Sequence, residues 1–173
     1  MKFFSGFSLK NEEYLFNEYI DKSDYTVCGF SYGAIKALRT TATMLENSQR
    51  VDRLQLFSPA FFQSKPEKFK RLQLMSYKKN RIIYMQQFIN GCFAPYEKKI
   101  VENVETDIAE LKELLEYEWS LALLKEVELK GVKIEVYLGG EDAIIDADIA
   151  KEFFLEVSTV TYIKDANHFL QLS

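Results

Sequence analysis

The pentapeptide Gly29-Phe-Ser-Tyr-Gly33 matches the pattern G-x-S-x-G and joins a predicted strand to a predicted helix. The residues before it, 25–29, are apolar and β-branched, which is typical of a buried strand. Residues 34–39 have the pattern of the first turns of a helix. A serine at such a sharp turn, a nucleophile elbow, has a strained backbone and an exposed hydroxyl. The sequence therefore predicts that Ser31 is a nucleophile.

The residues around Ser31 have predicted roles of their own. A side chain at Gly29 or Gly33 would strike the neighbouring strand or helix, so both positions require glycine. Tyr32 begins the predicted helix, and its backbone N–H can therefore face an oxyanion that forms on a substrate. These roles depend on the strand–turn–helix context, because short Gly/Ser patterns also occur by chance in loops.

The composition describes one folded domain of 173 residues, of which 47% are hydrophobic and 14% aromatic. A net charge of -4 and a pI near 5.2 argue against a nucleic-acid binder. We interpret Cys28 and Cys92 as reduced thiols rather than a disulfide framework. No apolar run is long enough to cross a membrane, and the start does not have the pattern of a signal peptide. A cytoplasmic protein is expected.

Strands alternate with helices at both ends of the chain, which indicates a parallel sheet built from βαβ units. Strands are predicted at residues 2–5, 25–29, 53–58, 132–138 and 159–163. Helices are predicted at residues 11–20, 34–46, 119–130 and 146–156.

Only helical patterns remain between residues 61 and 118. Helices are predicted at 69–77, at 81–90 with a stop at Gly91, and at 100–117. We interpret residues 61–118 as a helical lid insertion within a single domain that spans residues 1–173. The stripe of the third helix consists of Val101, Val104, Ile108, Leu111 and Leu115.

A base that could activate Ser31 is available in His168, the one histidine, which follows the last predicted strand. Asp142 follows the strand at 132–138, so nucleophile, acid and base each come after a strand, in the order Ser, Asp, His. We predict the catalytic triad Ser31, Asp142 and His168, with no metal and no cofactor. Asp146 is the alternative acid, although it fits the N-cap of the next helix better.

Several peptides are similar to one family. They are Phe4-Ser-Gly-Phe7, Gly29–Lys36, Lys70–Leu74, Gly131–Val136 and Asn167–Gln171. With them, most of the chain resembles an α/β-hydrolase, and more closely the short pimeloyl-acyl-carrier-protein methyl ester esterases of biotin synthesis in Helicobacter-type bacteria. The resemblance implies release of methanol from a methyl ester carried on acyl carrier protein, which leaves the free pimeloyl carboxylate.

The resemblance also implies an oxyanion loop near the start of the chain. Larger α/β-hydrolases usually begin this loop with His-Gly, whereas this sequence has Ser5-Gly6-Phe7. The donor required is a backbone N–H, and we assign it to Phe7, together with that of Tyr32. An ordinary turn at Gly6 is the alternative.

The sheet implied by the resemblance is a truncated one. Larger members have eight strands in the order 1-2-4-3-5-6-7-8, with the oxyanion loop after the third and the nucleophile after the fifth. With the loop at Gly6, and too few residues before Ser31 for a further strand and its helix, we expect a truncated α/β-hydrolase fold of about five parallel strands. Residues 2–5 and 159–163 would form its edges, with no strand between Phe7 and Tyr25.

A basic cluster lies in the predicted lid of this otherwise acidic chain. We predict that it docks the acidic acyl carrier protein; a solvated helix face is the alternative. Another serine esterase or an acyl thioesterase would share the whole predicted site, and an inactive hydrolase fold that only binds a partner would not need the triad. The cluster comprises Lys65, Lys68, Lys70, Arg71, Lys78, Lys79 and Arg81.

Overall fold

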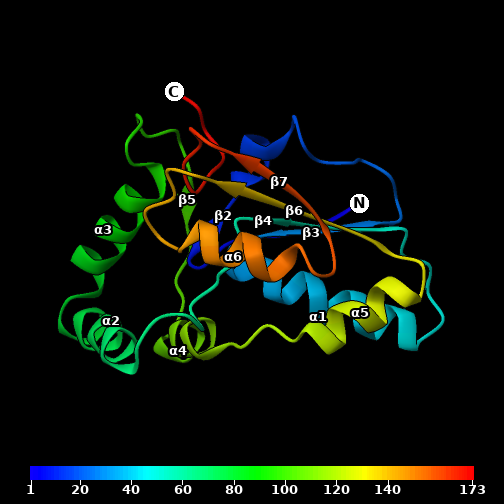
Figure 1. Ribbon diagram of the computed structural model, residues 1–173. Coiled ribbons are helices and arrows are strands. Elements are labelled where there is room, and N and C mark those ends of the chain that lie inside the picture. Colours follow the sequence, from blue (N-terminus) through cyan, green and yellow to red (C-terminus); the bar gives the residue numbers. More distant parts are fainter.

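The computed structural model describes residues 1–173 and contains one central parallel sheet (Figure 1). Its strand order is β1-β3-β4-β6-β7, and all neighbouring strands run parallel. The five predicted parallel strands, with the first and the last at the edges, are therefore confirmed. The strands are β1 (Lys2–Phe4), β3 (Thr26–Phe30), β4 (Arg53–Phe57), β6 (Lys133–Gly139) and β7 (Thr159–Ile163).

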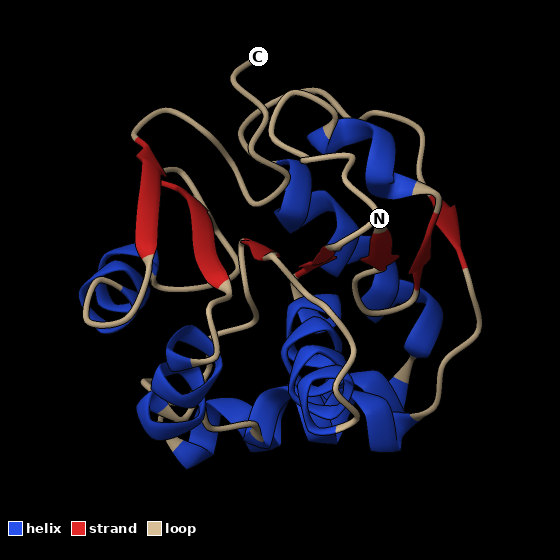
Figure 2. Ribbon diagram, turned by 90° about the vertical axis from the view of Figure 1, so that its right-hand side faces the viewer, coloured by secondary structure: helices blue, strands red, loops and turns tan.

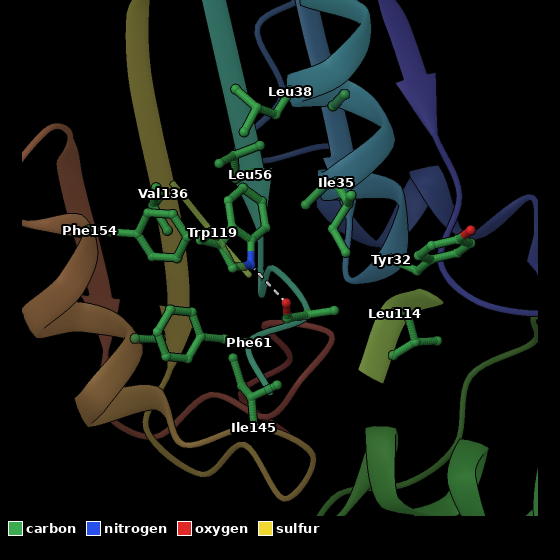
Figure 3. Close-up of a cluster of buried hydrophobic side chains, with 14 of the residues drawn as sticks. Tyr32, Ile35, Leu38, Leu56, Phe61, Leu114, Trp119, Val136, Ile145 and Phe154 are labelled. Atoms are coloured by element: carbon green, nitrogen blue, oxygen red, sulfur yellow. Dashed lines mark hydrogen bonds between the residues drawn. The ribbon is translucent and has the colours of Figure 1, made fainter. Parts of the chain in front are cut away.

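Three helices lie on one face of this sheet (Figures 1 and 2). Ile35 and Leu38 of the first helix pack with Leu56 of β4 and Val136 of β6 in a cluster of 29 buried residues (Figure 3). Removal of this apolar surface from water is the main force that holds the layers together. None of the helices in the protein is both long enough and apolar enough to cross a membrane. The three helices are α1 (Tyr32–Glu46), α5 (Leu121–Leu129) and α6 (Ala147–Phe154).

Trp119 shows why α5 begins later than predicted. The helix starts at Leu121 because the side chain of Ser120 accepts a hydrogen bond from Leu123 N at 3.2 Å and so caps it. Trp119 lies before this cap and points into the core, where its indole N–H donates to the carbonyl of Ala60 at 2.8 Å (Figure 3). The helix predicted at residues 119–130 is therefore present, but its first two predicted residues lie outside it.

The opposite face of the sheet is covered by a short 3-10 helix, η1 (Glu12–Phe16), and by the segment after β7. The prediction of a longer helix at residues 11–20 is wrong. The Phe16 side chain is fully buried and stacks on Phe57 with the two ring centres 4.9 Å apart, whereas Tyr14 is 45% exposed. The stacking of Phe16 on the sheet therefore outweighs the helical preference of residues 11–20, and only a short 3-10 helix forms.

Three of the four helices between β4 and β6 gather at one end of the molecule (Figure 1). The second continues through Gly91, where a stop was predicted, and ends at Phe93. A Cβ at Gly91 would lie 3.1 Å from Ile144 Cδ1, so glycine allows this helix to pack closely against the loop after β6. The helices are α2 (Glu67–Lys79), α3 (Arg81–Phe93) and α4 (Ile108–Glu116).

The predicted helix at residues 100–117 is also wrong in its first half. α4 begins only after Asp107, whose side chain accepts a hydrogen bond from Glu110 N at 3.0 Å. Before it, β5 (Glu102–Asn103) pairs antiparallel with β2 (Leu9–Lys10) in a separate two-stranded sheet. The expectation of no strand between Phe7 and Tyr25 is therefore wrong, although the central sheet gains no strand. Local sequence patterns do not report such a pairing between distant segments.

Candidate active site

Ser31 occupies the sharp turn between β3 and α1 with φ 51° and ψ -112°, a conformation that L residues rarely adopt. Its backbone is held from several sides. Ser31 N donates to the carbonyl of Phe57 at 2.9 Å, and Ser31 O accepts from Ala34 N and Ala60 N, each at 3.1 Å. A Cβ at Gly29 would lie 2.2 Å from the carbonyl oxygen of Gly33, so the tight turn requires glycine there. The predicted elbow geometry is therefore present.

The side chains of Asp142, His168 and Ser31 form one hydrogen-bonded line. His168 Nε2 lies 3.1 Å from Ser31 Oγ, and His168 Nδ1 lies 2.6 Å from Asp142 Oδ2. A proton on Nδ1 donates to the carboxylate and leaves Nε2 free to accept the serine proton. Asp142 Oδ1 accepts from the N–H groups of Ile144 and Ile145 at 2.8 and 3.1 Å, which fixes the carboxylate.

The structure brings Asp142, and not Asp146, to the histidine. Asp146 caps α6 instead, accepting a hydrogen bond from Ile149 N at 3.2 Å. The side chains of Asp142 and His168 have no exposed surface, and Ser31 is 3% exposed. In a site so well shielded from water, the interaction between carboxylate and imidazole is stronger than it would be at the surface.

Asn167 holds the loop that carries His168, a role that sequence reasoning missed. Its Nδ2 donates to the carbonyl of Phe93 at 2.8 Å, and its Oδ1 accepts from the N–H groups of Phe169 and Gln171, each at 3.0 Å. The side chain is fully buried. A buried amide with several backbone partners ties the histidine loop to the end of α3. Its position next to the lone histidine was the available signal.

The two predicted oxyanion donors lie close to one another. The rings of Phe7 and Tyr32 pack edge to face with their centres 6.4 Å apart, and both residues are buried. Neither backbone N–H donates a hydrogen bond within the protein. Buried N–H groups without an acceptor are rare, and two in the region of a candidate nucleophile are available to bind an oxyanion.

Tyr32 also connects the nucleophile helix to α4 through its hydroxyl group, a contact that was not predicted. The hydroxyl donates to Glu113 of α4, which also pairs with Arg39 of α1. These hydrogen bonds, that of Tyr32 first, hold the pKa of Glu113 below its ordinary value. Lys36 lies 4.3 Å from the centre of the Tyr32 ring and 3.4 Å from a carboxylate oxygen of Glu110. The network fastens α4 to the elbow.

A pocket of about 330 Å³ lies between helices α2, α3 and α4 and the loop that carries Asp142. Its wall is mainly apolar, which suits an aliphatic group rather than a charged one. Ile144, next to the hydrogen bonds of Asp142, forms part of the wall, so pocket and triad share a loop. Ser31 does not line this pocket. Other wall residues are Phe69, Tyr84, Phe88, Leu111 and Leu115.

The predicted basic cluster separates into three environments. Lys70 is 8% exposed and pairs with Glu67 at 3.2 Å, and Arg81 pairs with Glu105 at 2.5 Å. Lys65 lines the apolar pocket, with its Nζ 5.8 Å from the centre of the Phe69 ring. The exposed members without an ion pair are Lys68, Arg71, Lys78 and Lys79. The sequence did not indicate that Lys98 and Lys99 lie with Arg81 around a groove of about 570 Å³.

No family model and no curated protein sequence matches the chain. Solved structures do. A hydrolase from Oleispira antarctica aligns with TM-score 0.64 and 12% identity over 85% of this chain and 59% of its own. Carboxylesterase CesB from Bacillus subtilis aligns with TM-score 0.56 and 17% identity over 85% of this chain and 54% of its own. BioG from Haemophilus influenzae aligns with TM-score 0.57 and 12% identity over 96% of this chain and 87% of its own.

At these identities the similarity concerns the fold alone, and the chain spans little more than half the length of CesB and of the Oleispira hydrolase. The strand order, the elbow after β3 and the positions of Asp142 and His168 agree with that fold. The chain therefore has a truncated α/β-hydrolase fold, with five parallel strands flanked by helices.

Proposed function

We propose that this protein is a serine carboxylesterase. The hydrogen-bonded line Asp142–His168–Ser31 at a strained elbow carries the proposal. An inactive binding protein would not need this line, and a buried polar arrangement is costly unless every member is satisfied. The names of two similar structures, carboxylesterase CesB and naproxen esterase from Bacillus subtilis, favour the same reaction class.

The reaction proceeds through an acyl-enzyme. Ser31 Oγ attacks the ester carbonyl carbon while His168 Nε2 takes its proton, and Asp142 stabilises the imidazolium. The N–H groups of Phe7 and Tyr32 bind the negative carbonyl oxygen. When this intermediate collapses, the C–O bond to the alcohol breaks and His168 returns the proton to the leaving oxygen. A water molecule deprotonated by His168 then releases the acid by the same steps.

For the substrate, we propose the methyl ester of pimeloyl-acyl carrier protein, with methanol as the leaving group. Two features support it: the resemblance carried by the peptides around Phe7, Ser31 and His168, and the apolar pocket beside the Asp142 loop, which suits an aliphatic chain. The exposed basic side chains of α2 suit an acidic carrier protein.

Residues 61–118 act as a lid in this proposal. Ser31 is 3% exposed and His168 is fully buried, so a substrate reaches the serine only when part of the covering structure moves. A motion of α4 would have to break the contact between Tyr32 and Glu113.

The decisive experiment is incubation of the purified protein with pimeloyl-carrier methyl ester beside an aryl acetate. Mass spectrometry follows methanol release and the free carboxylate, and Ser31→Ala is the control. We expect a much larger specificity constant for the carrier-bound methyl ester. Cleavage of the thioester to the carrier would instead assign an acyl thioesterase, and preference for the aryl acetate would assign a general small esterase.

A further inference from the structure

We propose that Glu12 is a positioning residue that holds the oxyanion loop; the inference rests on the hydrolase reaction proposed above. Glu12 lies at the start of η1 and is fully buried. Its Oε1 accepts a hydrogen bond from the backbone N–H of Gly6 at 2.7 Å. Gly6 immediately precedes Phe7, the predicted oxyanion donor.

A second hydrogen bond holds the next peptide group, the one between Gly6 and Phe7. The carbonyl oxygen of Gly6 accepts from Leu9 N at 3.2 Å. In a planar trans peptide, the N–H of Phe7 points opposite to that carbonyl. The bond from Leu9 therefore aims the Phe7 N–H away from the turn, and the bond to Glu12 fixes the backbone of Gly6 on the preceding side.

Gly6 needs such a hold because glycine has the most backbone freedom to lose. It cannot easily be replaced by a stiffer residue, since a Cβ at this position would lie 2.8 Å from Cδ1 of the Phe30 ring. Phe30 is buried and stacks on Phe169, next to the catalytic histidine. Phe30 therefore leaves no room for a side chain at position 6, and the hydrogen bond to Glu12 restricts the flexible backbone of Gly6.

Burial of a carboxylate costs free energy because the group loses its contact with water, and here it provides only one hydrogen-bond acceptor. Glu12 has no ion-pair partner, and its Oε2 has no hydrogen-bond partner. Burial raises the pKa of its carboxyl group, and the hydrogen bond from Gly6 opposes that shift. The side chain of the neighbouring Glu13 makes no hydrogen bond and is only partly buried, although Glu13 lies on the same short helix. It is therefore a matched control.

Two substitutions separate the acceptor from the charge. Glu12→Gln keeps an acceptor at the same reach, whereas Glu12→Asp keeps the carboxylate but is one methylene too short to reach Gly6. With a small aryl ester, we expect Glu12→Asp to lower kcat about 10- to 100-fold with little change in KM, because a misplaced donor acts in the transition state. Glu12→Gln should recover most of kcat, and Glu13→Gln should match the wild type.

Two further readouts distinguish positioning from mere stability. Affinity for a trifluoromethyl ketone, whose adduct with Ser31 carries an oxyanion, should fall in parallel with kcat in Glu12→Asp. Amide hydrogen exchange at Gly6, followed by NMR, should accelerate in the same variant, whether or not any ester is turned over.

Unchanged exchange at Gly6, or wild-type kcat and ketone affinity in Glu12→Asp, would overturn the role of Glu12. A loss of kcat that simply follows a loss of folded protein in thermal melts would also overturn it. Failure of the wild type to hydrolyse any ester or to bind the ketone would instead refute the proposed hydrolase reaction, and the exchange measurement would still decide whether Glu12 orders the loop.

Discussion

Gly33, the second glycine of the elbow, lies directly against the carbonyl oxygen of Phe4 at the end of β1. A Cβ at Gly33 would come within 2.0 Å of that oxygen. Because β1 leads into the loop that contains Phe7, this approach places the nucleophile turn and the predicted oxyanion loop side by side. In the parallel pairing of β1 with β3, Phe4 lies opposite Gly29, the first glycine of the elbow, so the end of β1 lies beside this turn.

The first prediction tests this close approach. Gly33→Ala should lower the melting temperature and abolish most esterase activity, because the methyl group meets backbone atoms that cannot rotate away. Gly131→Asn is the control: Gly131 has φ 91° with open space around it, and asparagine tolerates positive φ. Normal stability and activity of Gly33→Ala would show that β1 can move away from the elbow.

The second prediction concerns the triad. Ser31→Ala and His168→Ala should each lower kcat about a thousandfold or more, and Asp142→Asn should be severely impaired because its amide favours the wrong histidine tautomer. Asp146→Asn should be nearly normal, since asparagine also caps helices well. Steady-state kinetics on an aryl ester measures all four variants. Loss of activity in Asp146→Asn with retention in Asp142→Asn would reassign the acid.

The third prediction concerns Asn167. Its replacement by alanine leaves the carbonyl of Phe93 and the N–H groups of Phe169 and Gln171 without their partner. We expect a loss of roughly 3 kcal/mol or more in unfolding free energy, since each of the three groups left without a partner costs about 1–3 kcal/mol. Urea unfolding measures it. Asn47→Ala, which removes an exposed bond to the carbonyl of Thr43, should cost far less; equal costs would contradict the role of Asn167.

The fourth prediction concerns carrier docking by the exposed basic residues of α2 that have no ion pair. Replacing Lys68, Arg71, Lys78 and Lys79 with glutamate should raise KM for a carrier-bound ester and weaken its salt dependence, with small esters unaffected. Lys70 of α2 is left out because its side chain is buried, and its loss would disturb packing. Equal losses on both substrates would indicate damage to the fold, and no loss on the carrier substrate would refute docking at α2.

The fifth prediction concerns pH. The folded-state pKa of Glu113 lies below its ordinary value of 4.5, owing to hydrogen bonds from Tyr32 and Arg39. Its contribution to stability is therefore complete above that value and is lost as the pH falls through the lowered pKa. Because the side chain is 38% exposed, we expect at most about 1 kcal/mol.

Urea unfolding of Glu113→Gln and the wild type at several pH values measures this contribution. The difference between them should be largest near neutral pH and should shrink in acid. Glu116→Gln, which removes a carboxylate of the same helix that lies 3.9 Å from Lys112, is the control for the loss of one surface charge. A difference between Glu113→Gln and the wild type that grows in acid would contradict the assignment.

The sequence alone was sufficient for the strands, the elbow and the relation between Ser31, Asp142 and His168, whereas the order of the strands in the sheet was expected from the resemblance to larger α/β-hydrolases. Each of these depends on patterns within a few residues, such as the glycines around Ser31 or the apolar run of β6. Their assembly follows from a general rule, because the carboxyl ends of parallel strands meet at one edge. Loops after successive strands therefore come together wherever they are in the chain.

Only the tertiary structure decided the features that depend on contacts between distant segments. Phe16 stacks on the sheet and shortens the predicted helix to η1, β2 finds its partner in β5 across the molecule, and Lys70 turns inward although it lies in a basic run. Glu12 and Asn167 reach their backbone partners through the same packing. The physical reason is that burial and hydrogen bonding with distant residues outweigh the weak preferences of a short segment.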